Sequence, residues 1–592
     1  MTSPANTRLP ISDDVEAVLP AAISRAHNWL KSTADEEDKA TEQLADLLRD
    51  EDGVKFTMDF VDRVMRPEDD KVAAHALKDI SSHYDPSFLG SINGALVGAG
   101  GFFGPILPNL VMPITRIYMR KMVGHLVLDA ESESLNKTLD KAAESGEQLN
   151  LNLLGEAVLG EAEAKSRAER TLKLIQNPRV TYVSVKASSM VAQLNQWDID
   201  GSVERLKERL RPLYEEAARR NPQVFINMDM EEYHDLHLTI RLFKELMSEP
   251  EFKNLESGIV LQAYLPDTFD ALKDIAEFAK KRVAEGGAKV KVRIVKGANL
   301  SMETVQGEVH DWPLATYTNK LDVDANYYRL LDFILREEYA DSVRIGVATH
   351  NLYTAAMAYE LGKKRGVLHM MDSEMLQGMS PAQQAAVRKV FDGRQILYTP
   401  VVHAEDFDVA VSYLVRRLEE NSAPQNFLYA LFAPGEEPLA DQEETFRRAV
   451  AKRWDTFAGA RRTQNRLEED GRQAPRTGRF TNEADTDPAL AANRQWALEA
   501  LKRNPGEHGI REVTDPAAVE GHIARAKELG TEWGKRPAAE RAAALEAVAD
   551  EIASQRGKFI SVAAYEANKT VTQTDPEAVS YTHLTLPTKR IV

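Results

Sequence analysis

The chain has 592 residues and a formal net charge of −18, from 74 Lys and Arg against 92 Asp and Glu, and it contains no cysteine. The length predicts two or more domains, and the acidic balance argues against a general nucleic-acid-binding surface, because phosphate neutralisation needs clustered cations. Without cysteine, disulfides, cysteine metal ligands and thiol catalysis are excluded.

Residues 1–145 predict an N-terminal helical arm. Met1–Asp14 has no basic stretch followed by an apolar core, so no secretory signal is predicted and a cytoplasmic location is expected. The uncharged segment Pro86–Thr115 is broken repeatedly by glycine and proline, which favours packed helices over a spanning helix and leaves a peripheral membrane contact open. Apolar residues recur at helical spacing in Val15–Leu30, Ala40–Leu48 and Arg116–Leu128.

Residues 146–465 alternate short apolar runs with longer amphipathic stretches, which predicts eight strands, each followed by a helix. This pattern is typical of a (β/α)8 barrel, in which chemistry lies at the C-terminal ends of the strands. The predicted strands are Leu149–Leu154, Val180–Val185, Val224–Met228, Gly258–Tyr264, Val290–Val295, Val343–Ala348, Val367–Met371 and Gln395–Tyr398. The predicted helices include Glu161–Ile175, Ser202–Ala218, Asp267–Val283 and Pro381–Val390.

The composition turns polar after the barrel, so residues 466–510 are predicted to form a linker. A helical unit follows over Pro516–Gly530 and Pro537–Ala563. The fold class is therefore α/β, a barrel with a helical arm before it and a helical fragment after it.

Charged residues end three of the predicted strands. Lys186 follows one strand, Asp229 follows the next, and Arg293 and Lys296 lie in and after a third. Charges on barrel strands are costly unless they are paired, so an internal ion-pair network is one interpretation. The functional interpretation is that opposite charges converge at one barrel mouth to form a site. The structural and the functional interpretation both stay open.

The helix after the eighth strand carries Tyr413, Arg416, Arg417 and Glu420 on one face. Two adjacent guanidinium groups suit a planar carboxylate, which they can bind through parallel hydrogen bonds. The alternative is a surface helix stabilised by an Arg416–Glu420 pair.

The motif Tyr413-Leu-Val-Arg416-Arg417-Leu-Glu-Glu420-Asn421 resembles a helix motif of the proline dehydrogenase family. Shorter similarities occur in family order along residues 150 to 430. They are Leu154-Gly155-Glu156-Ala157, Ser184-Val185-Lys186, Asn227-Met228-Asp229, Val260-Leu261-Gln262-Ala263-Tyr264, Arg293-Ile-Val-Lys296-Gly297-Ala298, Tyr317-Thr318-Asn-Lys320, Ala348-Thr349-His350-Asn351, Leu376-Gln377-Gly378-Met379 and Leu397-Tyr398-Thr-Pro400.

The resemblance implies a role for each of these residues. Lys186, Arg416 and Arg417 would hold the carboxylate of L-proline, and Tyr398 and Tyr413 would close over its ring. Asp229 and Glu420 would organise the network of charged side chains at the mouth. Arg293 would lie beside the flavin N5, and all three residues would belong to the FAD site. The other implied flavin contacts are Gln262, Lys296, Gly297, Thr318, Lys320, Thr349, His350 and Asn351. For His350 the alternative is a purely structural role, in which the ring only forms hydrogen bonds within the protein.

The implied reaction is oxidation of L-proline to 1-pyrroline-5-carboxylate, with hydride passing to FAD and electrons then passing to a membrane quinone. Such chemistry needs orientation and nearby cations rather than a metal or a nucleophile. An enzyme of this kind would be cytoplasmic or peripheral to the inner face of the cell membrane, and homo-oligomerisation stays open. The alternative function is a non-catalytic flavin-binding barrel that acts as a scaffold.

Two positions depart from the family pattern. Asn299 stands where many members have an aromatic residue, which puts one wall of the proline pocket in doubt. Ser373-Glu374 stands where Phe-Gln is usual.

Within residues 511–580, the stretch Ala524–Ser580 carries Trp533, Pro537-Ala-Ala-Glu540-Arg541 and Glu566-Ala-Asn-Lys569-Thr570. It is similar to the start of an aldehyde dehydrogenase domain, as in bifunctional proline dehydrogenase and L-glutamate gamma-semialdehyde dehydrogenase proteins. That domain uses NAD and a catalytic cysteine, so the chain is expected to lack the second activity. Residues 581–592 abandon the pattern and are expected to be a non-native tail.

Overall fold

The computed structural model describes most of the chain, with gaps. The continuous ranges are 13–33, 51–67, 69–84, 101–102, 104–123, 126–130, 132–155, 158–403, 423–433, 437–469, 483–503 and 513–579. Single described residues lie at 406, 410, 413, 414, 417, 420, 421 and 435.

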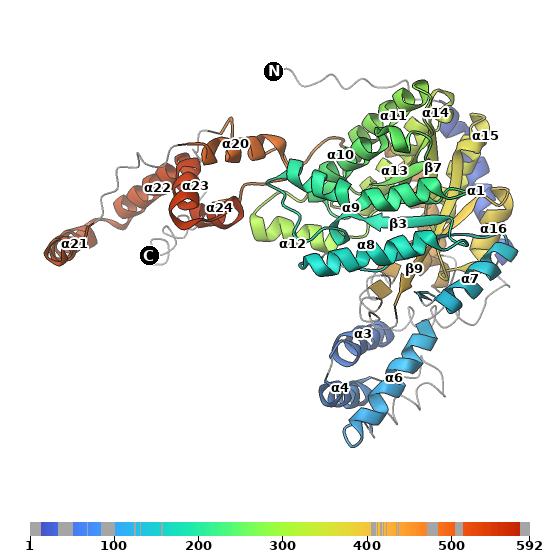
Figure 1. Ribbon diagram of the computed structural model, residues 1–592, viewed down its shortest axis with the longest axis horizontal. Coiled ribbons are helices and arrows are strands. Elements are labelled where there is room, and N and C mark those ends of the chain that lie inside the picture. Colours follow the sequence, from blue (N-terminus) through green and yellow to red (C-terminus); the bar gives the residue numbers. More distant parts are fainter. Residues whose placement is uncertain are drawn as a thin grey trace.

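The centre of the molecule is a closed parallel barrel of eight strands (Figure 1). Strand β9 pairs with both β8 and β2, which closes the sheet, and confirms the predicted (β/α)8 barrel. Nearly all strand residues are buried, and on several strands apolar side chains alternate with buried polar or charged ones such as Asn150, Asn227 and Glu374. The strands are β2 Gln148–Leu153, β3 Tyr182–Lys186, β4 Phe225–Asp229, β5 Ser257–Gln262, β6 Val290–Val295, β7 Val343–Ala348, β8 Met371–Leu376 and β9 Gln395–Val402.

Helices surround the barrel, and buried apolar residues of most of them form one core with the strands (Figure 1). They are α8 Glu161–Gln176, α9 Ile199–Arg219, α10 Leu236–Met247, α11 Thr268–Ala284, α12 Leu300–His310, α13 Lys320–Ile334, α14 Glu337–Ala340, α15 Leu352–Lys364, α16 Pro381–Val390, α18 Phe427–Phe432 and α19 Glu437–Lys452.

The predicted strand Val367–Met371 is wrong in position. Residues 368–370 form a short 3-10 turn, and β8 begins only at Met371. The sequence misleads here because β8 carries Asp372 and Glu374, both buried, where an apolar strand was expected. These acids are balanced by cations on neighbouring strands, as described below.

The N-terminal arm has two parts. Helix α1 (Asp13–Thr33) packs on α15, and ion pairs from Asp14 to Arg365 and from Arg25 to Glu360 hold it there. A separate cluster contains α3 (Glu51–Phe60), the π-helix Val61–Met65, α4 (Asp70–His83) and α6 (Pro108–Val123), with its own small core. The predicted helix Ala40–Leu48 lies outside the described residues.

The predicted helix Arg116–Leu128 differs from the structure at both ends. Helix α6 ends at Val123, and Leu128–Asp129 form a short strand, β1, that pairs with the end of β9. Helix α7 (Ser132–Glu144) then leads into the barrel.

The C-terminal helices project from one side of the barrel (Figure 1). The segment predicted as a linker contains helix α20 (Ala491–Leu501), and the predicted helix Pro537–Ala563 is divided at Gln555. The other helices here are α21 Pro516–Lys535, α22 Ala538–Ser554, α23 Arg556–Ala567 and α24 Val571–Val579.

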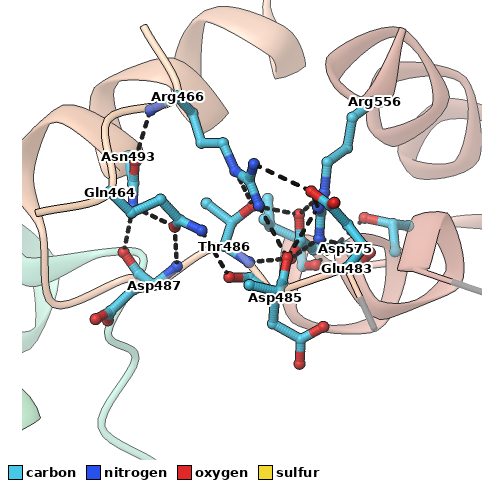
Figure 2. A network of polar contacts seen from close by, with 12 residues as sticks. Gln464, Arg466, Glu483, Asp485, Thr486, Asp487, Asn493, Arg556 and Asp575 are labelled. Atoms are coloured by element: carbon cyan, nitrogen blue, oxygen red, sulfur yellow. Dashed lines mark hydrogen bonds and ion pairs between the residues drawn. The ribbon is translucent and has the colours of Figure 1, made fainter. Parts of the chain in front are cut away.

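A buried polar cluster joins this C-terminal unit to the segment after the barrel (Figure 2). Arg556 forms an ion pair with Asp575 at 2.8 Å, and both side chains are 3% exposed. Asp575 also accepts hydrogen bonds from Thr486, through the backbone N at 2.6 Å and Oγ1 at 2.7 Å. Arg466 donates to Thr486 Oγ1 at 3.2 Å, so residues far apart in sequence share one network.

No helix in the described part of the chain has the length and apolar character needed to cross a bilayer.

Candidate active site at the barrel mouth

The C-terminal ends of neighbouring strands bring the predicted charged residues to one mouth. Lys186 ends β3 and is the register partner of Asp229, which ends β4. Lys186 Nζ lies 3.4 Å from the carboxylate of Glu231, just beyond β4. Gln262 ends β5 and donates to the carbonyl of Glu231 at 2.9 Å, so adjacent strand ends are linked.

Asp229 is the centre of a buried hydrogen-bond cluster. Tyr398 Oη donates to Asp229 Oδ2 at 2.8 Å, while Ser184 and Asn227 donate to Oδ1 at 3.1 and 2.9 Å. Burial raises the pKa of Asp229, and the Arg293 charge and the Tyr398 hydroxyl oppose that rise. Burial and Asp229 raise the pKa of Tyr398 well above its usual value, so this tyrosine remains a hydrogen-bond donor.

Arg293 lies beside this cluster. Its Nε donates to Glu374 Oε2 at 2.6 Å, and its guanidinium carbon lies 4.7 Å from the Tyr398 ring centroid. Burial lowers the pKa of Arg293, but the Glu374 and Asp229 carboxylates outweigh burial and raise it overall. Arg293 is therefore a permanent cation in a largely dry part of the mouth.

Arg417 faces the mouth from the helical residues that follow β9. Its guanidinium carbon lies 5.2 Å from the Tyr413 ring centroid. The guanidinium group forms an ion pair with Glu420, and the Arg417 side chain is 18% exposed. The Arg417 charge is close enough to lower the pKa of His350 and to be influenced by Tyr398. Glu420 pairs with Arg417. Arg416 lies outside the described residues, so the Arg416–Glu420 pair stays a prediction.

Two lysines share one buried carboxylate at the next strand end. Lys296 Nζ lies 2.5 Å from Asp324 Oδ1, and Lys320 pairs with the other oxygen. Burial lowers the pKa of Lys296 to about 8, although Asp324 opposes the shift. Thr318, just before this pair, is exposed.

The predicted group Thr349, His350 and Asn351 follows β7 and has structural partners. Asn351 Oδ1 accepts from the backbone N of Tyr353 and Thr354 at 3.0 and 3.1 Å, which caps α15. His350 Nε2 accepts from the backbone N of Leu376 at 2.9 Å, so the proton of the neutral ring lies on Nδ1, which faces Ser380. Burial lowers the pKa of His350 to about 4, with the Arg417 charge as a further cause.

The sequence did not predict the buried charges beneath Arg293. Lys291 and Glu374 are both 0% exposed at the side chain, and Lys291 Nζ lies 2.7 Å from Glu374 Oε1 and 2.9 Å from Asp372 Oδ2. The signal that could have revealed them was the spacing of two, which puts Lys291 and Arg293 of β6 on one face and Asp372 and Glu374 of β8 on one face.

The residues at the mouth fit a polar cofactor that carries phosphate groups. Gln262 Oε1, Gln377 Oε1 and Arg417 Nε are buried and have no hydrogen-bond partner among the described residues. Two ammonium groups face the single Asp324 carboxylate, which suits an added anion. Gly297 has φ +121°, and an added Cβ would lie 2.4 Å from the Tyr264 ring, so the backbone there is tightly confined.

Comparison with known families gives a match over the barrel. A sequence model described as proline dehydrogenase matches residues 135–430. Among curated proteins, the bifunctional protein PutA of Escherichia coli (strain K12) is 28% identical over 561 residues, covering 86% of this chain and 40% of that protein. The proline dehydrogenase of Deinococcus radiodurans is 26% identical over 266 residues, covering 42% of this chain and 77% of that protein.

Solved structures extend the similarity. Proline utilization A from Corynebacterium freiburgense is 50% identical with a TM-score of 0.68, covering 82% of this chain and 47% of that chain. The same protein from Bdellovibrio bacteriovorus, inactivated by N-propargylglycine, is 24% identical with a TM-score of 0.76, over 97% of this chain and 61% of that one. This second likeness concerns the fold. The chain thus spans less than half the length of the bifunctional curated relative.

Proposed function

The chain belongs to the proline dehydrogenase family, and from that premise we propose that it oxidises L-proline to 1-pyrroline-5-carboxylate with FAD as its cofactor. FAD, when bound, supplies the acceptor for the hydride that leaves the ring carbon beside nitrogen. The work of the protein is to bind both molecules, orient them and exclude water from between them.

The observation that carries this proposal is the convergence of Arg417, Arg293 and Lys186 at one mouth with Tyr398 and Asp229. Arg417 Nε has no hydrogen-bond partner in the described part of the chain, although it is buried. A guanidinium with an unused buried donor favours a small carboxylate ligand. We assign the carboxylate to Arg417, Arg416 and Lys186.

The rings at the mouth would cover the substrate. Tyr413 stacks near Arg417, and Tyr398 is fixed through its hydroxyl by Asp229. Both can therefore restrict how a five-membered ring turns above the cofactor. Asn299 is the N-cap residue of α12, and we propose that the pocket wall at this position lacks an aromatic side chain.

The residues proposed to hold FAD gather around the same mouth. Lys296 and Lys320 suit the phosphates, Gln262 offers an unused oxygen, and Arg293 supplies a fixed cation near the redox-active ring. The full proposed set is Asp229, Gln262, Arg293, Lys296, Gly297, Thr318, Lys320, Thr349, His350, Asn351 and Glu420. Because Asn351 caps α15 and His350 binds the backbone of Leu376, these two would act mainly by holding the strand end in shape.

The deciding test is anaerobic addition of L-proline to the purified yellow protein. We expect the flavin absorbance to bleach. Bound flavin that does not bleach would favour the non-catalytic scaffold instead.

Arg417→Met should weaken proline-dependent reduction about 10- to 100-fold, the range for a lost charged hydrogen bond. Arg447→Met is the matched control, because Arg447 pairs with Glu443 on the outer helix α19.

We further propose that the electrons pass to a membrane quinone and that α6 makes the peripheral contact. Leu110, Ile114 and Ile117 lie at helical spacing on α6 and are 60%, 59% and 64% exposed. Ile106 and Leu107, just before the helix, extend this apolar surface. Ile114→Asp with Ile117→Asp should abolish flotation with lipid vesicles and leave proline-dependent bleaching intact. Unchanged flotation would contradict the assignment to α6.

We propose that residues 511–580 correspond to the start of an aldehyde dehydrogenase domain, as the bifunctional relatives suggest. The chain contains no cysteine for that chemistry. We therefore propose that the chain lacks the second activity, and NAD-dependent oxidation of glutamate semialdehyde by the purified chain would contradict this proposal. Sedimentation would determine whether the chain forms a homo-oligomer.

A further inference from the structure

A ladder of alternating charges crosses the inside of the barrel and ends at Arg293. Glu256, before the first residue of β5, lies 2.9 Å from Arg344 of β7, and Arg344 lies 2.8 Å from Asp372 of β8. Asp372 then contacts Lys291 of β6 at 2.9 Å, and Lys291 contacts Glu374. Glu374 carries the ladder to its last member, Arg293, at 2.6 Å.

Strand β7 lies between the two strands that supply the inner charges, and it leaves room for them at Gly346. Gly346 is the register partner of Arg293 on one side and of Asp372 on the other. A Cβ added to Gly346 would lie 2.1 Å from Glu374 Oε1 and 3.0 Å from Lys291 Cε. A side chain on β7 would therefore occupy the space through which the Lys291–Glu374 pair passes.

The inner part of the ladder is held away from water. Lys291 Nζ faces the adjacent rings of Tyr182 and Phe225, at 5.3 and 5.8 Å from their centroids. Burial lowers the pKa of Lys291, but Glu374 and Asp372 outweigh burial and raise it. Buried charges persist only when well paired, and removing one partner leaves the other uncompensated.

The two oxygens of Glu374 have separate tasks. Oε1 faces Lys291, and Oε2 accepts from Arg293 Nε. Because Nε is an inner atom of the guanidinium, the remaining nitrogens of Arg293 are left to act at the mouth. Glu374 thus fixes both the orientation of Arg293 and the amount of positive charge that it presents.

We propose that Glu374 is a positioning residue for Arg293, and that the Lys291–Glu374 pair sets how strongly the mouth favours the reduced cofactor. This inference rests on the proposed function. A neutral residue at position 374 leaves Arg293 and Lys291 with one carboxylate fewer between them. The added net positive charge favours the more negative, reduced flavin. A neutral residue at position 291 acts in the opposite direction.

The experiment compares Glu374→Gln, Lys291→Met and the double variant by equilibrium reduction of the bound flavin against a reference dye. Each single variant keeps one ion pair, because Asp372 still faces Lys291 and Arg293 still faces Glu374. We expect Glu374→Gln to raise the ratio of reduced to oxidised flavin about tenfold, which is ~30 mV for a two-electron couple. Lys291→Met should lower the ratio by a similar factor.

The double variant distinguishes a tuned pair from two independent effects. It restores the net charge, and the amide oxygen that Glu374→Gln introduces can still accept from Arg293 Nε. Its ratio should therefore return to within about twofold of the unmodified chain. Glu256→Gln is the matched control, because Glu256 is the partly exposed, far end of the ladder and its loss should not shift the ratio.

Thermal unfolding of the flavin-free chain gives a second readout, in which the double variant should be more stable than the sum of the single changes predicts. If Glu374→Gln and Lys291→Met both bind flavin with an unchanged ratio, the positioning role is overturned while the proposed function stands. An unmodified chain that retains no flavin overturns both proposals.

Discussion

Lys296 is a residue at the mouth whose charge changes within the range of about pH 7 to 9. Its pKa is lowered to about 8, so it loses its proton as the pH rises through that value. If its ammonium group binds a phosphate of FAD, flavin affinity of the flavin-free chain should fall about tenfold between about pH 7 and about pH 9. Quenching of flavin fluorescence would measure this.

The lysine control comes from the other end of the barrel. Lys289 binds the backbone carbonyl of Ala340, so Lys289→Met should keep the pH dependence. Lys296→Met should bind flavin weakly at every pH. An equal slope in Lys296→Met and in the unmodified chain would exclude Lys296 as the source.

His350 predicts a second effect of pH, on stability. Its folded pKa of about 4 is below its unfolded value of about 6.5. As the pH falls below 6.5 the unfolded chain gains a proton that the folded chain does not bind, so the free energy of unfolding falls. At about pH 5 we expect His350→Gln to remove about 2 kcal/mol of this acid sensitivity in urea unfolding. Near pH 7 the His350→Gln variant and the unmodified chain should respond more similarly to acid. Equal losses in the free energy of unfolding at pH 5 would contradict the assignment of this effect to His350.

Single residues show where the sequence was sufficient and where it was not. Arg417, Tyr398 and Asp229 were predicted at the mouth because each stands in a motif at a strand end or on the following helix. The partnership of Lys291 with Glu374 could not be predicted, because it depends on the register of two strands separated by β7. The position of Glu374 was noted only as a departure from the family pattern.

Among the elements, the parallel strands were predictable because short runs rich in apolar residues recur between amphipathic helical stretches, even where buried polar residues interrupt them. Strand β8 was placed too early because its own residues include two buried acids. Strand β1 was missed because two residues carry no periodic signal, and its place depends on pairing with Val401 and Val402 of β9.

Strand β7 gives a prediction at this scale. Gly346→Ala would place a methyl group 2.1 Å from Glu374 Oε1, so the ion pair or the strand must shift. We expect a loss of about 1–3 kcal/mol in the free energy of unfolding, typical of an overpacked core. Denaturant unfolding would measure this.

A paired change tests the cause of that loss. Combining Gly346→Ala with Glu374→Ala and Lys291→Met removes the side chains that fill the space beside position 346. In that background, alanine at position 346 should lower the free energy of unfolding only slightly. A full cost in that background would mean that the clash lies elsewhere.

At the scale of the whole molecule, the C-terminal helices depend on a small number of buried polar contacts (Figure 2). Asp575→Asn removes the charge that balances Arg556, and breaking such a pair costs ~3–5 kcal/mol. We expect the α20–α24 unit to unfold at a lower temperature and the barrel transition to stay in place. Differential scanning calorimetry with limited proteolysis would separate the two transitions.

The control for this change is Glu577→Gln, which removes a nearby exposed pair with Lys569 and should leave both transitions unchanged. A single transition that moves as a whole in Asp575→Asn would mean that the barrel and the C-terminal helices unfold together. The sequence predicted helices here but not their attachment, because Arg556 and Asp575 show no pattern until the chain is folded.

The Lys291–Glu374 pair has a consequence for the history of the protein. A lysine or a glutamate arriving alone would still face Asp372 or Arg293, but it would leave the buried ladder with one unbalanced charge, so either single change should be selected against. The two positions should therefore have been exchanged together, through a short-lived or compensated intermediate. In an alignment of relatives, lineages with an uncharged residue at 374 should carry an apolar residue at 291, and only they should tolerate a side chain at 346.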